Sequence, residues 1–166
     1  MQVMITTILL MFFCFAIVYG ALCDVTTYRI PNAVSYGLVG LFIPYALANF
    51  DNLPILLHVG TGVLVFVMCL VFWQLRWLGG GDVKFVGAIA LWMGPDKILI
   101  FVILLAVASG IFIAILKFLY QWNAWFQSSQ LPSFIKQMLT KTGERAIPYG
   151  LPAAISAIIS RFFIGN

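Results

Sequence analysis

Long apolar stretches alternate with short polar ones along the chain, and this pattern predicts a helical membrane protein. The apolar stretches, which we expect to form helices, cover residues 3–22, 32–50, 55–75, 83–94, 98–120 and 147–164. A helix needs about 20 residues to cross the hydrocarbon core of a bilayer, and most of these stretches have that length. We therefore expect an all-α, polytopic fold with about six transmembrane helices in one membrane-embedded domain, residues 1–166.

Glycine and proline mark the boundary between the fourth and fifth stretches. The segment Gly94-Pro95-Asp96-Lys97 predicts a turn there. The fourth stretch, 83–94, then reaches only about 18 Å at 1.5 Å per residue, less than the ~30 Å hydrocarbon core. Because this short helix starts beside Asp82, we expect that aspartate to lie below the membrane surface or to border a water-filled cavity. Residues 121–146 are polar and then amphipathic, which predicts a segment in the membrane interface.

Composition supports the membrane assignment and narrows the chemistry. Hydrophobic residues make up 63% of the chain and charged residues only 8%, whereas soluble domains have roughly 25% charged residues. Cys14, Cys23 and Cys69 are scattered without a CxxC pair, which argues against a zinc site or a disulfide framework. His58 has no second histidine with which to bind a metal. We expect no cofactor and no nucleic-acid partner, and we expect the lipid bilayer to surround the chain.

Basic residues are distributed unevenly between the two ends of the predicted helices. Six spans would put on one side Arg29, Arg76, Lys84, Lys117, Lys136, Lys141 and Arg145, and on the other side Lys97 and Arg161. The side richer in lysine and arginine is typically cytoplasmic, which predicts that both termini lie outside. Asp24 and Asp82 would then share the cytoplasmic side, and Asp51 and Asp96 would lie in turns on the other side.

Asp24 and Asp82 are the candidate catalytic residues. An ionisable group near the hydrocarbon is costly and indicates function, and the glycines at 79–81 form a shaped turn in front of Asp82. Two close carboxylates share a proton, so they can polarise water, take its proton and protonate a leaving amine, as in aspartyl proteases. Structural roles are open as well: Asp82 would cap a helix beside Lys84, and Asp24 would pair with Arg29.

Two other classes of function are also open. A small proton-coupled transporter would use the two carboxylates to relay protons, although the chain lacks the paired broken helices of many transporters. A proton relay also needs groups at several depths across the bilayer, whereas both aspartates are predicted on one side of the membrane. A non-enzymatic component of a pilus or secretion platform would use the aspartates only to cap helices.

Three motifs resemble those of type IV prepilin peptidases. Gly79-Gly80-Gly81-Asp82-Val83-Lys84 is similar to the family's GxGD motif, usually G-x-G-D-[VIL]-K. Asp24 followed by Arg29-Ile30-Pro31-Asn32 resembles the other catalytic stretch, and Ile147-Pro148-Tyr149-Gly150-Leu151-Pro152 resembles a signature near the last helix. The motifs span nearly the whole chain, in the family's order and six-helix layout. Presenilin-like proteases also carry GxGD, but they pair it with a Tyr-Asp, whereas Asp24 follows a cysteine.

The resemblance implies an intramembrane-type aspartyl endopeptidase that removes the basic leader of type IV or Flp prepilins at the cytoplasmic face of the inner membrane. It implies Asp24 and Asp82 as the catalytic pair. Larger members also N-methylate the new amino terminus and carry paired CxxC motifs, which are absent here. We therefore expect peptidase activity without methyltransferase activity, as in the short type associated with Tad/Flp pili. Archaeal preflagellin peptidases are relatives that the motifs leave open.

The resemblance also suggests residues that shape the site. Gly79 and Gly81 would let the substrate backbone and a facing helix come close. Lys84 would orient the substrate, or would simply extend to the membrane interface. Pro148 and Gly150 would loosen the start of the last helix so that it lines the site, or would serve packing alone.

Overall fold

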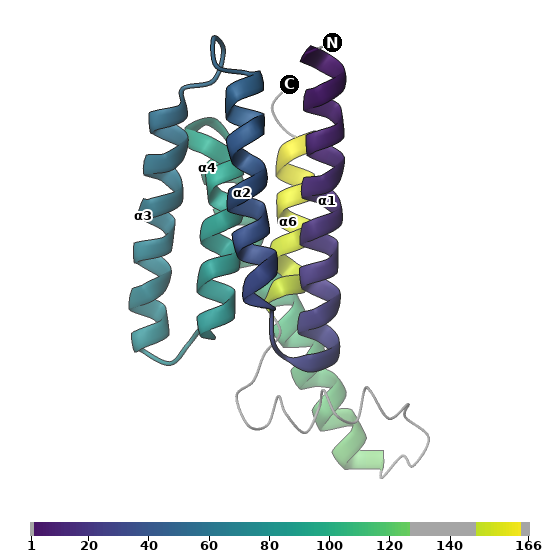
Figure 1. The fold of residues 1–166 in the computed structure, drawn as a ribbon. Helices are drawn as coiled ribbons and strands as arrows, with labels where there is room; N and C mark the ends of the chain where they lie inside the picture. Colours follow the sequence, from purple (N-terminus) through teal and green to yellow (C-terminus); the bar gives the residue numbers. More distant parts are fainter. Residues whose placement is uncertain (1, 127–148, 164–166) are drawn as a thin grey trace.

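The computed structural model describes residues 2–126 and 149–163, which form a bundle of helices (Figure 1). The helices are α1 (Gln2–Thr27), α2 (Asn32–Ala48), α3 (Ile55–Gln74), α4 (Gly80–Phe126) and α6 (Gly150–Phe162). The segments Gln2–Thr27, Ile55–Gln74 and Gly80–Phe118 are long and apolar enough to cross a membrane, and α2 and α6 are shorter apolar helices. The expected all-α membrane protein is therefore confirmed. The predicted interfacial segment lies mostly outside the described residues.

The described residues form five helices instead of the predicted six, and the difference arises at Gly94. The predicted turn at 94–97 is a kink inside α4, where Gly94 has φ 64° and ψ −174° while its neighbours on both sides are helical. Only glycine adopts this backbone region readily. Figure 1 shows the chain turning back at the kink, so that the later part of α4 runs toward the opposite end of the bundle. Gly94 thus separates two helical parts of α4, which correspond to the two predicted stretches 83–94 and 98–120.

His58 of α3 stabilises this kink. In an unbroken helix the carbonyl oxygen of Leu91 would accept a hydrogen bond from residue 95, but Pro95 has no N–H. The Nδ1 atom of His58 donates to that oxygen instead, over 2.9 Å. The buried imidazole also lies directly against Gly94, where a β-carbon would overlap with the ring. The single histidine therefore has a structural role in the kink.

The variant Gly94→Ala is expected to lower the free energy of unfolding by about 2–6 kcal/mol. The backbone of Gly94, with φ 64° and ψ −174°, costs an alanine roughly 1–3 kcal/mol, and overpacking against His58 costs a further 1–3 kcal/mol, in order of magnitude. Unfolding by SDS in mixed micelles measures the change. Gly110→Ala in the same helix is the control, because no atom lies within 4 Å of its added β-carbon. Equal stability of the two variants would contradict the role given to the kink.

The first part of α4 forms the centre of the bundle. Its residues are buried on all sides, among them Val83, Phe85, Ile89, Trp92 and Met93, as expected for a helix that is apolar all round. The helices α2, α3 and α6 pack on α4, and α1 packs on α2 and α6. The buried face of α6 consists largely of alanine, serine and glycine, which lets helix backbones come close in a membrane.

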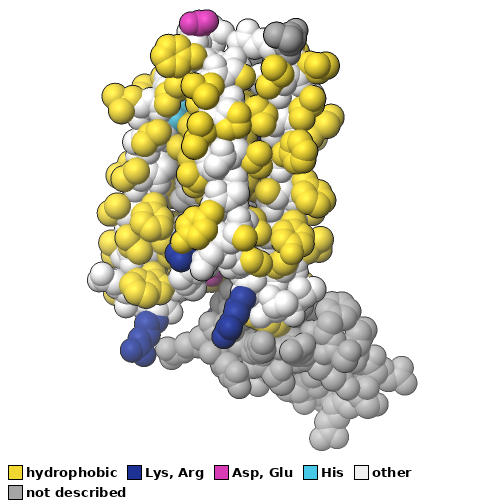
Figure 2. Space-filling model, in the orientation of Figure 1, with side chains coloured by type: hydrophobic (Ala, Val, Ile, Leu, Met, Phe, Trp, Pro, Cys, Tyr) yellow, Lys and Arg dark blue, Asp and Glu magenta, His cyan; other side chains and the backbone are white. Residues whose placement is uncertain are grey.

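The outer surface follows the pattern of a membrane protein. Figure 2 shows a face covered largely by hydrophobic side chains, with the lysine and arginine side chains on this face gathered at one end. The helix α1 buries only one stripe, formed by Phe13, Ile17, Ala21 and Asp24, whose spacing of three to four residues is that of one helix face. The stripe carries Asp24 into the interior of the bundle.

The helix α1 extends five residues beyond the predicted end at residue 22. Asp24 was expected at a junction between helix and loop, but it lies within the last turns of α1. In the last turns of α1, the hydroxyl groups of Thr26 and Thr27 donate to the carbonyl oxygens of Leu22 and Cys23, over 2.8 Å and 2.7 Å. The helix closes with the N–H of Tyr28 donating to the carbonyl oxygen of Asp24 over 2.9 Å.

Candidate functional site

Asp24 is held by the start of the last helix. Its Oδ2 atom accepts a hydrogen bond of 2.7 Å from the backbone N–H of Gly150, the first residue of α6. The N-terminus of a helix favours a negative charge because its first N–H groups are unpaired and its dipole is positive there. Gly150 permits the close approach, because a β-carbon on it would lie 2.9 Å from both Cβ and Oδ2 of Asp24. The structure thus brings Asp24 and Gly150 together, a contact that the sequence did not predict.

Asp82 is the third residue of α4 and reaches back to the residue before the helix. Its Oδ2 atom accepts a hydrogen bond of 3.0 Å from the backbone N–H of Gly79, and the N–H of Val83 donates to the carbonyl oxygen of Gly79. This is half of a capping box, in which a side chain in the first turn satisfies the N–H of the capping residue. The capping role considered for Asp82 therefore exists, but it occupies only one carboxylate oxygen.

The glycines before Asp82 let the start of α4 approach neighbouring groups closely. A β-carbon on Gly79 would lie 2.9 Å from Oδ2 of Asp82, and one on Gly81 would lie 3.5 Å from the carbonyl oxygen of Ile30. A side chain at position 79 would thus crowd the oxygen of Asp82 that accepts the bond from the Gly79 N–H. Gly81 lies against the connection between α1 and α2, which holds the Ile30-Pro31-Asn32 motif.

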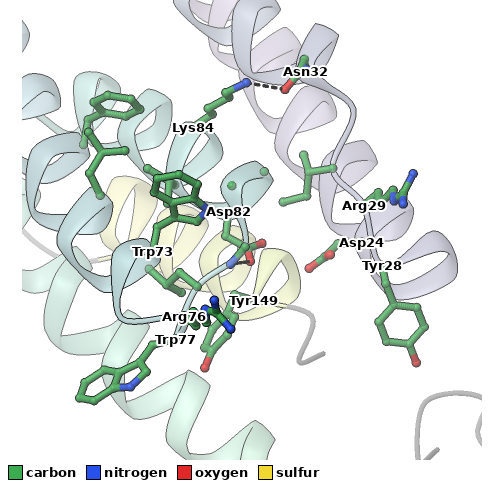
Figure 3. A pocket seen from close by; sticks show the side chains of 18 residues that line it. Asp24, Tyr28, Arg29, Asn32, Trp73, Arg76, Trp77, Asp82, Lys84 and Tyr149 are labelled. Atoms are coloured by element: carbon green, nitrogen blue, oxygen red, sulfur yellow. Dashed lines mark hydrogen bonds between the residues drawn. The ribbon is translucent and has the colours of Figure 1, made fainter. Parts of the chain in front are cut away.

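Asp24 and Asp82 line one cavity of about 690 Å³ at this end of the bundle. Figure 3 shows both carboxyl groups directed into the space between α1 and α4. Only 4% of Asp24 and 8% of Asp82 is exposed, so both carboxylates are largely desolvated. Within residues 2–126 and 149–163, the Oδ1 atom of neither aspartate has a hydrogen-bond donor. Each carboxylate is thus fixed through its Oδ2 atom by one backbone N–H.

The rest of the cavity wall is aromatic, basic and apolar. It comprises Tyr28, Arg29, Ile30, Asn32, Phe66, Leu70, Trp73, Arg76, Trp77, Leu78, Gly79, Gly80, Gly81, Val83, Lys84 and Tyr149. Sequence reasoning did not assign Trp73, Trp77 or Tyr149 to the site. Their position next to the motifs is the signal that could have indicated them. Tyr149 directly precedes Gly150, Trp73 lies at the end of α3, and Trp77 lies two residues before Gly79.

Two residues at the edge of the cavity have a left-handed backbone. Tyr28 follows α1 with φ 55°, and Arg76 follows α3 with φ 60°, a conformation that is uncommon for residues other than glycine. Partial burial raises the pKa of the Tyr28 phenol above its ordinary value, and the negative charge of Asp24 raises it further. Tyr28 therefore remains a neutral phenol at physiological pH.

Lys84 lines the cavity but points away from the carboxylates. Its Nζ atom donates to Oδ1 of Asn32 over 3.0 Å, as Figure 3 shows, and lies 5.9 Å from the centre of the Tyr36 ring. It therefore joins α4 to α2, and it does not act as the partner of Asp82 that the sequence left open. Pro148 lies outside the described residues.

The other aspartates lie at the opposite end of the bundle. Asp51 follows Asn49, which bonds to Thr6 near the start of α1, and Asp96 follows the kink. Among the residues that the structure describes, no three His, Cys, Asp or Glu side chains form a group that could hold a metal ion. The chemistry available in the cavity is that of two carboxylates.

Two carboxylates at one buried site are suited to general acid and base catalysis. One ionised and one protonated group can together deprotonate water and protonate a departing group. Such a pair suits hydrolysis of a peptide bond that reaches the cavity.

Comparison with protein families identifies the chain. A model described as the type IV leader peptidase family matches residues 9–115. The chain belongs to the type IV leader peptidase family. The resemblance inferred from the three motifs is thereby confirmed, and this leader peptidase is a protease of the membrane. Comparisons with curated proteins and with solved structures found no match.

The matched region contains both aspartates of the leader peptidase but ends before α6. It includes Asp24, the glycine turn and Asp82. Tyr149 and Gly150 join the site through the fold, because the N–H of Gly150 bonds to Asp24 across 126 positions of the chain.

Proposed function

We propose that the chain is an aspartyl endopeptidase that removes the basic leader of type IV or Flp prepilins, with Asp24 and Asp82 as its catalytic pair. The observation that carries the proposal is the shared cavity, in which each carboxylate is anchored through its Oδ2 atom by one backbone N–H. Membership of the leader peptidase family supports a peptide substrate. The proposed activity needs no cofactor and does not include N-methylation.

The reaction uses the two aspartates as one unit that holds a single proton. The ionised carboxylate takes a proton from water as the water oxygen attacks the scissile carbonyl carbon, and the protonated carboxyl group gives its proton to the carbonyl oxygen. The resulting tetrahedral intermediate collapses as the C–N bond breaks. One carboxyl group protonates the leaving amine, and the other takes back the proton from a hydroxyl group of the intermediate. The proton count is restored at the end of the cycle, and the two macroscopic titrations belong to the pair.

The glycines next to the two aspartates help to hold the carboxylates in place. The N–H groups of Gly79 and Gly150 orient the two carboxylates, and Gly81 packs against the Ile30 backbone next to Asp82. Orientation of this kind contributes to rate by holding reacting groups in place. Lys84 supports the site by fixing α4 against Asn32 at the start of α2.

We further propose six membrane crossings, with α4 crossing once on each side of Gly94. The site then faces the cytoplasm from the inner membrane, and both termini lie outside. The gathering of Arg29, Arg76 and Lys84 around the cavity supports this orientation, because basic residues favour the cytoplasmic side. Figure 2 shows basic side chains at one end only of the visible face. The whole chain forms one membrane-embedded domain in this proposal.

A cleavage assay tests the proposed function. The purified protein in detergent is incubated with a prepilin that carries its leader, and mass spectrometry identifies the products. We expect one cut between the leader and the apolar helix, with release of the free leader. Uptake of protons by liposomes that contain the protein, without any cleavage, would contradict the proposal and favour transport.

A further inference from the structure

A second cavity opens on the side of the bundle, between α2 and α3. Its volume is about 520 Å³, and its lining residues are Ser35, Tyr36, Val39, Phe42, Ile43, Val59, Gly62, Val63, Phe66, Lys84, Gly87, Ala88 and Leu91. We call it the lateral groove. The helices α2 and α3 each pack on α4 but make little contact with each other. The groove therefore has α4 as its floor and is open toward the lipid.

The lateral groove continues from the catalytic cavity. Phe66 and Lys84 line both spaces. From Phe66 the groove follows α3 back to Val59, a distance of about 10 Å at 1.5 Å per residue. The lining of α4 extends in the same direction, from Lys84 to Leu91. The groove is thus about two helical turns long and leads from the carboxylates toward the middle of the membrane.

Polar groups lie only at the end of the groove next to the catalytic cavity. Ser35 and Lys84 are located there, and the rest of the lining is almost entirely apolar. Val39, Ile43 and Val63 leave 45%, 59% and 57% of their surfaces exposed to an occupant. An occupant that fits this distribution has a polar end in the catalytic cavity and an apolar stretch that leaves it along the groove.

The floor of the groove is held close to α3 by two glycines. A β-carbon on Gly62 would lie 3.0 Å from Cβ of Leu91, and one on Gly87 would lie 3.0 Å from Cβ of Phe66. The two helices therefore approach closely along the whole groove. The floor of the groove combines the small residues Gly87 and Ala88 with Lys84 and Leu91 at its two ends.

We propose that the lateral groove binds the first turns of the substrate's apolar helix, immediately after the bond that is cut. This inference rests on the proposed function. Occupation would place the scissile bond at the junction of groove and cavity, beside Phe66 and Lys84. Binding energy from the apolar segment would thereby be used to position the peptide bond at the carboxylates. A lipid chain in the groove has no peptide segment to place in the catalytic cavity, so it would not use the connection between the two spaces.

Two substrates and two matched variants test the inference. Val63→Trp fills the groove, and Leu64→Trp places the same side chain on α3 at a residue that is 62% exposed and does not line the groove. One substrate is a full prepilin, and the other is a short peptide that spans the cleavage site without the apolar helix. We expect Val63→Trp to lower kcat/KM for the full prepilin at least about tenfold, mainly by raising KM, and to leave the short peptide unaffected. Leu64→Trp should change neither rate.

Photocrosslinking gives a readout that does not depend on cleavage. A photoreactive residue is placed at 63 or at 64 in the Asp82→Asn protein, which is expected to bind a full prepilin without cutting it. We expect crosslinks to the apolar helix of the prepilin from 63 and not from 64. If Val63→Trp does not fold, Ile43→Trp on the other wall of the groove replaces it in the kinetic assay.

The outcomes separate the two proposals. If the wild type cleaves the prepilin but the variants at 63 and 64 behave alike, the inference is overturned and the proposed function is retained. Crosslinks from 63 to lipid alone, in the presence of the prepilin, overturn it as well. If the wild type cleaves neither substrate, the proposed function fails and the inference fails with it.

Discussion

Asp24→Asn and Asp82→Asn are each expected to reduce leader removal about a thousandfold, because general acid and base catalysis contributes on the order of 10²–10⁴ in rate. Asparagine keeps the size of the side chain and one oxygen, so the bonds from the N–H groups of Gly150 and Gly79 are preserved. Each variant should therefore fold while losing the ability to exchange a proton with water or with the leaving amine. The initial rate of leader release measures the loss, and SDS unfolding checks the fold.

Asp51→Asn and Asp96→Asn are the matched controls. Both residues lie at the end of the bundle opposite the cavity, so cleavage should proceed within about twofold of the wild-type rate. The double variant of Asp24 and Asp82 should lose little more activity than either single variant, because residues that act as a unit have non-additive effects. A single variant of either aspartate that cuts at the wild-type rate would refute the catalytic pair.

Gly150→Ala is expected to reduce cleavage about a hundredfold, the second largest effect of a single substitution. The new methyl group would lie 2.9 Å from both Cβ and Oδ2 of Asp24, so either α6 or the carboxylate has to move. Movement in either direction breaks the bond from the N–H of Gly150 and displaces Asp24 from its partner. A shift of about 1 Å in a catalytic group is enough for a loss of this size. The steady-state rate with the short peptide substrate isolates the effect from binding of the apolar helix.

Gly37→Ala provides the control for Gly150→Ala. It makes the same chemical change in α2, where no atom lies within 4 Å of the added β-carbon. We expect full activity and a stability equal to or slightly above that of the wild type, because alanine favours a helix over glycine. Full activity of Gly150→Ala would show that the contact with α6 does not orient Asp24.

Local pattern was enough to select the two aspartates. An ordinary helix cap does not require three glycines in front of Asp82, so these glycines indicated a further role for that aspartate. The uneven distribution of basic residues predicted that Asp24 lies on the same side of the membrane as Asp82. The structure brings both into one cavity. The helices α2 and α3 were also predicted within about two residues of their observed ends, because proline and the turn at 51–54 limit them.

Contacts between distant parts of the chain were not predictable in this way. The bond between Gly150 and Asp24 depends on how α6 packs, and no local preference encodes that packing. Lys84 was considered as a partner of Asp82 because it is two residues away, but side chains two apart on a helix do not face each other. It bonds to Asn32 instead. The turn predicted at 94–97 corresponds to the kink at Gly94, but the bond from His58 to the Leu91 carbonyl is a tertiary contact that the sequence did not indicate.

The anchoring of Asp24 by Gly150 has a consequence for biosynthesis. A ribosome adds Asp24 and Asp82 to the chain long before it reaches Gly150. A growing chain therefore carries both carboxylates into the membrane while the amide that orients Asp24 has yet to be made. In the proposed mechanism, Asp24 therefore reaches its working orientation only after α6 has been inserted.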